Sequence, residues 1–359
     1  MKGALALWLS GCLLLSGCSG LPTAREMGDM ALMRTMGVDR GADGVEVTAS
    51  TGPRAKGLQA EGEKALVLSA RADSLSAACL SMQGHSDSYV FYGYVDQLLV
   101  GEELAREGIK PVLDYFARDE ELGLGAQLWL VRSGTARQAV ESGGETGVDG
   151  RLSTMQLDGK LGEASMSRTA GEVYTDLMER GAAFVPALVT GELEDATLTE
   201  GGYGIIKGER LVGYLEGEAA RGLELLLGRA PAEVLTVQLE GNRVSARVNM
   251  VNTTVGLEIQ EERPTKLQIK CRADVGVTEY EQELSRAQQQ ALSNQLKGKL
   301  MDRLEGALAA LRQWQADCAG LGLKGAAFHP QLWKEIREQW PMWFRMLELD
   351  IQLQVMIHD

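Results

Sequence analysis

Apolar and polar residues alternate along several segments in the carboxyl-terminal part of the chain, and this pattern restricts that part to sheets with one buried face. Residues 235–239 alternate, and residues 244–250 repeat the pattern after a Gly241-Asn242 turn, which predicts a β-hairpin. Residues 267–275 and 347–357 show the same period of two. We therefore expect an antiparallel sheet that is packed on one face and wet on the other.

A long helix is predicted from Glu281 to about Asp317, and it is the natural cover for that sheet. Its leucines recur mostly four residues apart, so their stripe drifts by about 40° per step around the helix axis. A curved sheet suits such a stripe, whereas a coiled coil would need a 3,4 alternation that appears only at the end of the segment. The leucines are Leu284, Leu292, Leu296, Leu300, Leu304, Leu308 and Leu311.

The amino-terminal half predicts a mixture of helices and strands. The expected helices are 25–36, 66–82, 102–107, one beginning near Pro111 and ending at 118–119, and 172–179. The expected strands are 45–49, 89–100, 126–132 and 184–189. Residues 126–132 are apolar on both faces and should lie centrally in a sheet. Residues 142–150 are rich in glycine and acidic residues and are interpreted as a mobile loop.

A polar, acidic segment at 191–202 marks the expected main division of the chain. After it, a hairpin over 203–215 and a helix over 216–227 are predicted. The resulting fold class is α+β and multi-domain, with mixed or antiparallel sheets flanked by helices, and a carboxyl-terminal antiparallel sheet packed against the long helix. We expect a signal peptide at 1–17, a lipidated tether at 18–24, an amino-terminal α+β module of one or two lobes at 25–195, and a carboxyl-terminal module at 200–359.

The amino terminus has the layout of a secretory signal, with Lys2 followed by an apolar run that is too short for a permanent membrane helix. The tetrapeptide Leu15-Ser16-Gly17-Cys18 resembles the bacterial lipobox, in which a cysteine carrying diacylglycerol follows small residues. We therefore expect cleavage before Cys18 and attachment of the mature protein to a membrane through lipid on this cysteine. The alternative is an ordinary signal peptide with an incidental cysteine.

The net charge argues against binding of nucleic acid or anionic headgroups by bulk charge, and the cysteine content suggests no disulfide framework. Removal of Lys2 leaves 35 basic against 50 acidic residues, a net charge of −15, so bulk charge would not hold nucleic acid or anionic headgroups. The remaining cysteines, Cys79, Cys271 and Cys318, have no recognisable spacing. Cys271 falls on the apolar phase of a strand and should be buried, and a Cys79–Cys318 disulfide stays an open alternative.

The sequence offers no catalytic constellation. Its three histidines are His85, His329 and His358, and no zinc, nucleophile-elbow or phosphate-loop motif is present. His85 and Asp87 could ligate a metal, but a pair of exposed residues in a surface loop is the simpler interpretation. We expect no enzymatic activity, no cofactor and no metal.

An aromatic cluster near the carboxyl terminus is the best candidate for contact with a partner. Trp333, Trp340, Trp343 and Phe344 follow Pro330 in a chain that is otherwise poor in aromatic residues. They would either fix the long helix onto the sheet or, if exposed, form a binding surface. Gly320 and Gly322 precede the cluster and should help to end the long helix.

The order of these motifs resembles the Ger(x)C family, the lipoprotein C subunits of nutrient germinant receptors in endospore formers. That family ends with a long helix, a D-x-x-G-x-G turn, a P-x-x-W segment, a second tryptophan and a terminal strand. The resemblance extends upstream and covers essentially the whole mature chain. Its upstream motifs are Arg25-Glu26-Met27, Gly37-Val38-Asp39, 105–109 with Leu113 and Arg118-Asp119, and 204–213.

The resemblance implies a noncatalytic subunit that acts in spore germination through contacts with the membrane A and B subunits of the receptor. Lipid on Cys18 would hold it on the outer face of the cytoplasmic membrane, the inner membrane of the spore. The alternative from another class is a lipoprotein that presents a small solute to a transporter. Such a protein should have two α/β lobes with parallel sheets and a deep cleft between them.

Overall fold

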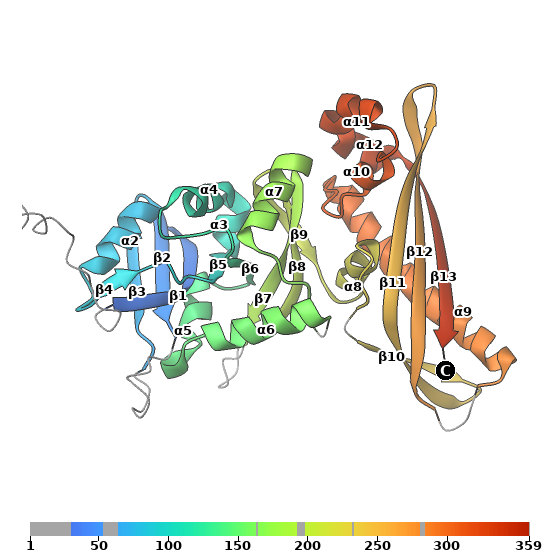
Figure 1. Ribbon diagram of the computed structural model, residues 1–359, viewed down its shortest axis with the longest axis horizontal. Helices are drawn as coiled ribbons and strands as arrows, with labels where there is room; N and C mark the ends of the chain where they lie inside the picture. Colours follow the sequence, from blue (N-terminus) through green and yellow to red (C-terminus); the bar gives the residue numbers. More distant parts are fainter. Residues whose placement is uncertain are drawn as a thin grey trace, which may run out of the picture.

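The computed structural model describes residues 30–52, 64–162, 164–191, 198–231, 233–280 and 284–358. These residues form two β-sheets that lie side by side, each with its own helices (Figure 1). The first sheet has nine strands in the order β3-β2-β1-β5-β6-β7-β8-β9, with β4 beside β1. The second sheet has four strands in the order β10-β11-β12-β13. Together they confirm the α+β, multi-domain fold class.

The first sheet and its helices extend to residue 215. Its strands are β1 (Met30–Gly41), β2 (Gly44–Thr51), β3 (Val67–Ala72), β4 (Tyr89–Phe91), β5 (Gln97–Gly101), β6 (Gln127–Arg132), β7 (Ala182–Thr190), β8 (Leu198–Lys207) and β9 (Arg210–Leu215). Its helices are α2 (Leu75–Gln83), α3 (Glu102–Glu107), α4 (Lys110–Arg118), α5 (Ala136–Glu141), η2 (Gly144–Thr146), α6 (Asp149–Leu161) and α7 (Ala170–Arg180).

The four strands β1, β5, β6 and β7 run parallel in the middle of the first sheet and are covered on both faces. Helices α2, α3, α4 and α7 contribute to the core on one face, and α5 and α6 contribute to the core on the other. Parallel strands need this double cover, because both of their faces are apolar. The prediction that residues 126–132 form a central strand is confirmed.

The predicted helix over 25–36 is wrong where the structure describes it, because residues from Met30 onward form β1. Thr35 pairs with Gln97 of β5 and with Ser50 of β2, so the segment lies between two strands. Its methionines fit a helix locally, yet Met33 and Met36 are both fully buried in the sheet core. Tertiary pairing overrides local propensity here.

Three other predicted elements of this part need correction. The helix over 66–82 divides into β3 and α2, with Ser74 capping the helix. The strand over 89–100 divides into β4 and β5 around a turn in which the Val95 amide donates to the Tyr92 carbonyl. The loop over 142–150 contains η2 and the start of α6, a helix whose weak amphipathicity left no clear signal in the sequence. The strand at 45–49 and the helices at 102–107 and 172–179 are confirmed.

The predicted hairpin over 203–215 is confirmed as β8 and β9, but it pairs with β7 and so extends the first sheet. Gly208 takes a φ of +61° at its turn, a value that suits glycine. Phe184, Tyr203 and Leu215 of this edge pack in the same core cluster as the second sheet. The division of the chain near 195–200 stays a proposal.

The second sheet is formed by β10 (Val234–Leu239), β11 (Asn242–Gln260), β12 (Arg263–Glu279) and β13 (Glu348–His358). β10, β11 and β12 are antiparallel, and the turn at Gly241 that joins the first two strands is confirmed. β13 runs parallel to β12, which corrects the prediction of a purely antiparallel sheet. The chain between them forms several helices, and such a long crossover lets a strand return in the same direction.

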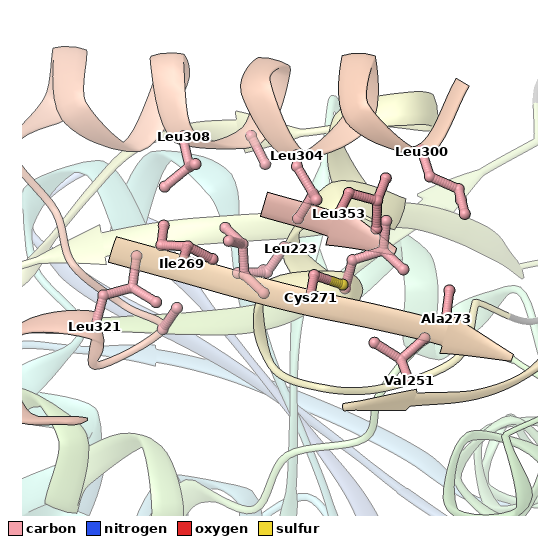
Figure 2. Close-up of a cluster of buried hydrophobic side chains, with 14 of the residues drawn as sticks. Leu223, Val251, Ile269, Cys271, Ala273, Leu300, Leu304, Leu308, Leu321 and Leu353 are labelled. Atoms are coloured by element: carbon pink, nitrogen blue, oxygen red, sulfur yellow. The ribbon is translucent and has the colours of Figure 1, made fainter. Parts of the chain in front are cut away.

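The long helix is confirmed as α9 (Arg286–Trp314), which begins with a capping box at Ser285. Figure 2 shows Leu300, Leu304 and Leu308 of α9 directed at Ile269 and Leu353 of the sheet. Every predicted leucine of the stripe is buried, and Leu284 precedes the helix. α8 (Gly217–Leu226) packs against α9 and completes the cover.

The described cysteines Cys79, Cys271 and Cys318 are free and buried. Cys79 lies in a core of the first sheet, whereas Cys318 lies in the core of the second. The alternative of a Cys79–Cys318 disulfide is therefore wrong for this structure. The expected burial of Cys271 is confirmed, with 2% of its surface exposed.

Candidate partner-contact site

The aromatic residues selected from the sequence lie in a group of short helices between α9 and β13. These are α10 (Leu321–Gly325), α11 (Pro330–Ile336), η3 (Arg337–Gln339) and α12 (Trp340–Met346), which we call the cap. Figure 1 shows the cap at one end of the second sheet. Pro330 starts α11, where its missing N–H costs no helical hydrogen bond.

Asp317 holds the cap together from inside. One carboxylate oxygen accepts from the Leu321 amide at 2.8 Å, and the other accepts from the Gly322 amide at 2.7 Å and from Trp340 Nε1 at 2.8 Å. Burial raises the pKa of Asp317, and these three donors and the nearby Arg180 oppose that rise. A buried carboxylate requires such donors, so the residue acts as the hub of the cap.

Glycine is required twice in this turn. Gly320 has a φ of +66°, in the left-handed region. A Cβ on Gly322 would lie 2.2 Å from Cε2 of Trp340, because the indole rests directly on the backbone. α9 itself ends at Trp314, and the residue that caps it, Gln315, has a φ of +54°, so neither of the predicted glycines terminates the helix.

The four candidate aromatic residues divide into two buried and two half-buried side chains. Trp340 and Phe344 are 3% and 0% exposed and stack with ring centroids 6.2 Å apart. Trp333 contacts Trp340 edge-on at 5.5 Å. Trp340 and Phe344 therefore fix the cap to α9 and the sheet, as the packing interpretation predicts. A partner-contact role for the half-buried Trp333 and Trp343 stays a prediction.

The cap also carries exposed apolar side chains that were not selected from the sequence. Phe328 is 91% exposed between α10 and α11, and Met346 and Met342 of α12 are 59% and 44% exposed. Met342 and Met346 share α12 with Trp343, directly before β13. Only one feature of the sequence marks Phe328, which stands between two alanines and His329-Pro330, outside any amphipathic pattern. Apolar groups exposed together often mark a binding surface.

A groove of about 390 Å³ separates the cap from α7 of the first sheet. Met178, Leu323 and Trp333 supply apolar walls, and Arg180 and Arg337 supply charge. Arg180 pairs with Asp176 at 3.1 Å, and its guanidinium carbon lies 3.2 Å from the position of a Cβ on Gly320. α7 and the cap thus meet around one arginine.

Other motif positions serve packing. Asp39 accepts from the Ala136 and Arg137 amides at 2.8 Å each, so it binds the start of α5 to β1. A Cβ on Gly37 would lie 3.1 Å from Ala136, which explains the close approach of this helix. The Ile109 amide donates to the Glu209 carbonyl at 2.8 Å and ties α4 to the β8–β9 turn. These packing contacts explain why Asp39, Gly37 and Ile109 occur at these positions without assigning them a catalytic role.

Two further residues were considered from the sequence, Cys18 as the lipid attachment site and His85 as a metal ligand less economical than a surface loop. Cys18 lies outside the described residues. His85 Nδ1 is 3.0 Å from the Ser81 carbonyl at the end of α2, and no group of three metal-binding side chains occurs among the described residues. Within that same part of the chain, no helix is long and apolar enough to cross a membrane.

Two family models match the chain in order. Residues 23–190 match a spore germination protein N-terminal domain, and residues 201–359 match the C-terminal domain described as spore germination B3/GerAC like. The solved structure of the GerBC protein has 19% sequence identity and a TM-score of 0.62, and the alignment covers 90% of this chain and 97% of that chain. No curated protein matches the sequence.

Proposed function

Because the chain belongs to the Ger(x)C family of spore germination proteins, we propose that it is a noncatalytic subunit of a nutrient germinant receptor. The observation that carries the proposal is the pair of family matches, which follow each other over nearly the whole chain. The structure adds a physical reason for a noncatalytic role. The motif residues Asp39, Asp317 and Trp340 are occupied with packing contacts inside the protein.

The proposal includes a lipid anchor on Cys18. The supporting observation is the lipobox-like sequence Leu15-Ser16-Gly17-Cys18 after a short apolar run. Two or three acyl chains on one cysteine give durable attachment, since each buried methylene contributes about 0.8 kcal/mol. The folded part would then lie on the outer face of the cytoplasmic membrane, which is the inner membrane of the spore.

The cap is the proposed contact for the membrane A and B subunits. Phe328, Met342 and Met346 expose apolar surface in the same segment of the chain as the half-buried Trp333 and Trp343. Aromatic and methionine side chains are enriched at the centres of protein interfaces. Burial of Phe328 alone would contribute about 2 kcal/mol to association.

The solute-binding alternative predicts two lobes with parallel sheets. The first sheet has parallel central strands, but the second sheet contains the antiparallel strands β10, β11 and β12. α9 fills one face of that second sheet with leucine side chains. This arrangement supports the receptor subunit over a two-lobed solute binder.

Deletion of the gene tests the proposed function. Spores lacking the protein should germinate poorly when challenged with amino acids or sugars, and the unaltered gene should restore germination. A Cys18→Ala gene should release the protein from the membrane fraction and restore less germination. Normal germination of the deletion strain, in a background without a second copy, would overturn the proposal.

The contact surface needs its own test. Phe328→Ser and Met342→Ser should leave the fold intact, because both side chains are exposed, and should reduce recovery of the A and B subunits in a pull-down of the detergent-solubilised receptor. Leu80→Ser is the matched control, since Leu80 is 76% exposed on α2, away from the cap. Equal recovery from all three variants would contradict a contact at the cap.

A further inference from the structure

A second cavity, of about 680 Å³, opens on the first sheet, far along the chain from the cap. It lies at the edge where Asp73 follows the end of β3, where β5 continues into α3, and where β2 begins at Gly44. Because β3 and β5 both run parallel to β1, this is the carboxyl edge of the parallel strands. Ligands of open α/β sheets bind at this edge.

The floor of the cavity is apolar. Leu75 at the start of α2, Leu104 of α3 and Val112 of α4 reach it, together with Val45 and Pro111. Leu75, Leu104 and Val112 are between 2% and 9% exposed, so they form a fixed wall. A cavity of this volume with such a floor is within the range of small-molecule sites.

The rim of the cavity is acidic. Four carboxylates line it, from Asp73, Glu107, Asp114 and Glu209, against the single guanidinium of Arg118. Arg40 pairs with Glu107 at 2.8 Å, and Lys110 pairs with Asp114 at 2.6 Å. Asp73 and Glu209 then exceed Arg118 by one negative charge. An apolar floor under an acidic rim suits a ligand that has an apolar body and a positive end.

We propose that this cavity binds a small amphiphilic cation, such as a primary amine on an apolar body. The apolar body lies on Leu75, Leu104 and Val112, and the ammonium group lies at the rim near Asp73 and Glu209. The site is independent of the cap, and it adds ligand binding to a protein whose proposed role is contact with other receptor subunits.

A matched set of three probes tests both halves of the proposal. The purified protein is titrated with 2-phenylethylamine, 2-phenylethanol and 3-phenylpropanoate, and binding is followed by saturation-transfer NMR. The amine should bind with a Kd near the millimolar range, as expected for a ligand of this size. The alcohol should bind several-fold more weakly, and the carboxylate should show no binding.

Exposed residues of the rim give variants that should fold normally. Asp73→Asn combined with Glu209→Gln should weaken binding of the amine about fivefold and leave binding of the alcohol unchanged. Ser76→Trp places an indole at the mouth of the cavity and should abolish binding of both probes. Ser81→Trp on the same helix lies outside the cavity lining and serves as the control.

Two results would overturn the proposal. One is the absence of amine binding at about 10 mM in protein whose circular dichroism spectrum is native. The other is amine binding that persists unchanged in Ser76→Trp, because the ligand would then occupy another place. Equal binding of the amine and the alcohol would overturn the role of the acidic rim.

Discussion

Asp317 accepts a hydrogen bond from Trp340 Nε1 at 2.8 Å, and this contact joins the end of α9 to the start of α12. The two residues are 23 positions apart, yet both are more than nine-tenths buried. The carboxylate also accepts from the Leu321 and Gly322 amides. One side chain thus determines where the cap sits on the second sheet.

Replacement of Asp317 by alanine should destabilise the second sheet and its helices by about 3 kcal/mol or more, because three buried donors lose their acceptor. Asp317→Asn retains an acceptor oxygen of the same size and should cost less. Urea unfolding followed by far-UV circular dichroism measures both. A loss below about 1 kcal/mol for the alanine variant would show that the hub is dispensable.

The pH dependence of stability should reveal Glu46, which lies on β2. Burial opposes its ionisation, but hydrogen bonds from Arg71 at 3.0 Å and Arg137 at 2.8 Å hold the pKa of Glu46 below its usual 4.5. A lowered pKa in the folded state stabilises the fold above the unfolded value, and this stability is lost as the pH falls through the folded value.

The comparison that isolates Glu46 is the unaltered protein against Glu46→Gln. Their urea midpoints should differ most near neutral pH and converge as the pH falls through the lowered pKa of Glu46, where the carboxylate of the unaltered protein becomes protonated. A constant difference across this range would assign the effect to packing instead of charge.

The buried thiols should be nearly inert in the folded protein. Burial raises the pKa of Cys79 to about 11 and also raises the pKa values of Cys271 and Cys318. The thiolate is the reactive form, and little of it exists at neutral pH. An aromatic disulfide reagent should therefore label these three residues only after denaturation in guanidinium.

The same labelling tests the absence of a disulfide. Denatured protein should give three reactive thiols from these positions without prior reduction, counted by mass spectrometry of peptides. If Cys79 and Cys318 react only after treatment with dithiothreitol, they are bridged and the arrangement of the two cores is different from the one described.

The second sheet was predictable because its signals are local. Strands such as 267–275 alternate strictly, and each leucine of α9 reports the buried face of its own turn. The direction of β13 was not predictable, since a parallel and an antiparallel strand with one wet face have the same period. Only the crossover through the cap determines it.

The first sheet was harder to predict because its central strands are buried on both sides. β1 contains Met33 and Met36, which fit a helix equally well, and its strand form depends on pairing with residues more than 60 positions away. For the candidate site, the sequence located the aromatic cluster but could not tell the buried Trp340 and Phe344 from its other members, and the exposure of Phe328 depends on how the cap folds.

Two helical glycines give the sharpest test of the packing between α8 and α9. Gly222 lies where the helices touch, and a Cβ there would be 2.0 Å from the carbonyl oxygen of Arg303 and 2.9 Å from Ala307. The contact atom is backbone, so it cannot move aside as a flexible side chain would. Gly222→Ala should therefore destabilise the protein by about 2 kcal/mol.

Gly306 lies in the middle of α9 with nothing within 4 Å of its Cβ position. Gly306→Ala should stabilise the protein by about 0.5–1 kcal/mol, since alanine loses less backbone entropy than glycine in a helix. The same substitution should thus have opposite signs at the two positions when both are measured by urea unfolding. If Gly222→Ala were also stabilising, α8 could not lie against Arg303, and the cover of the second sheet would have to be packed differently.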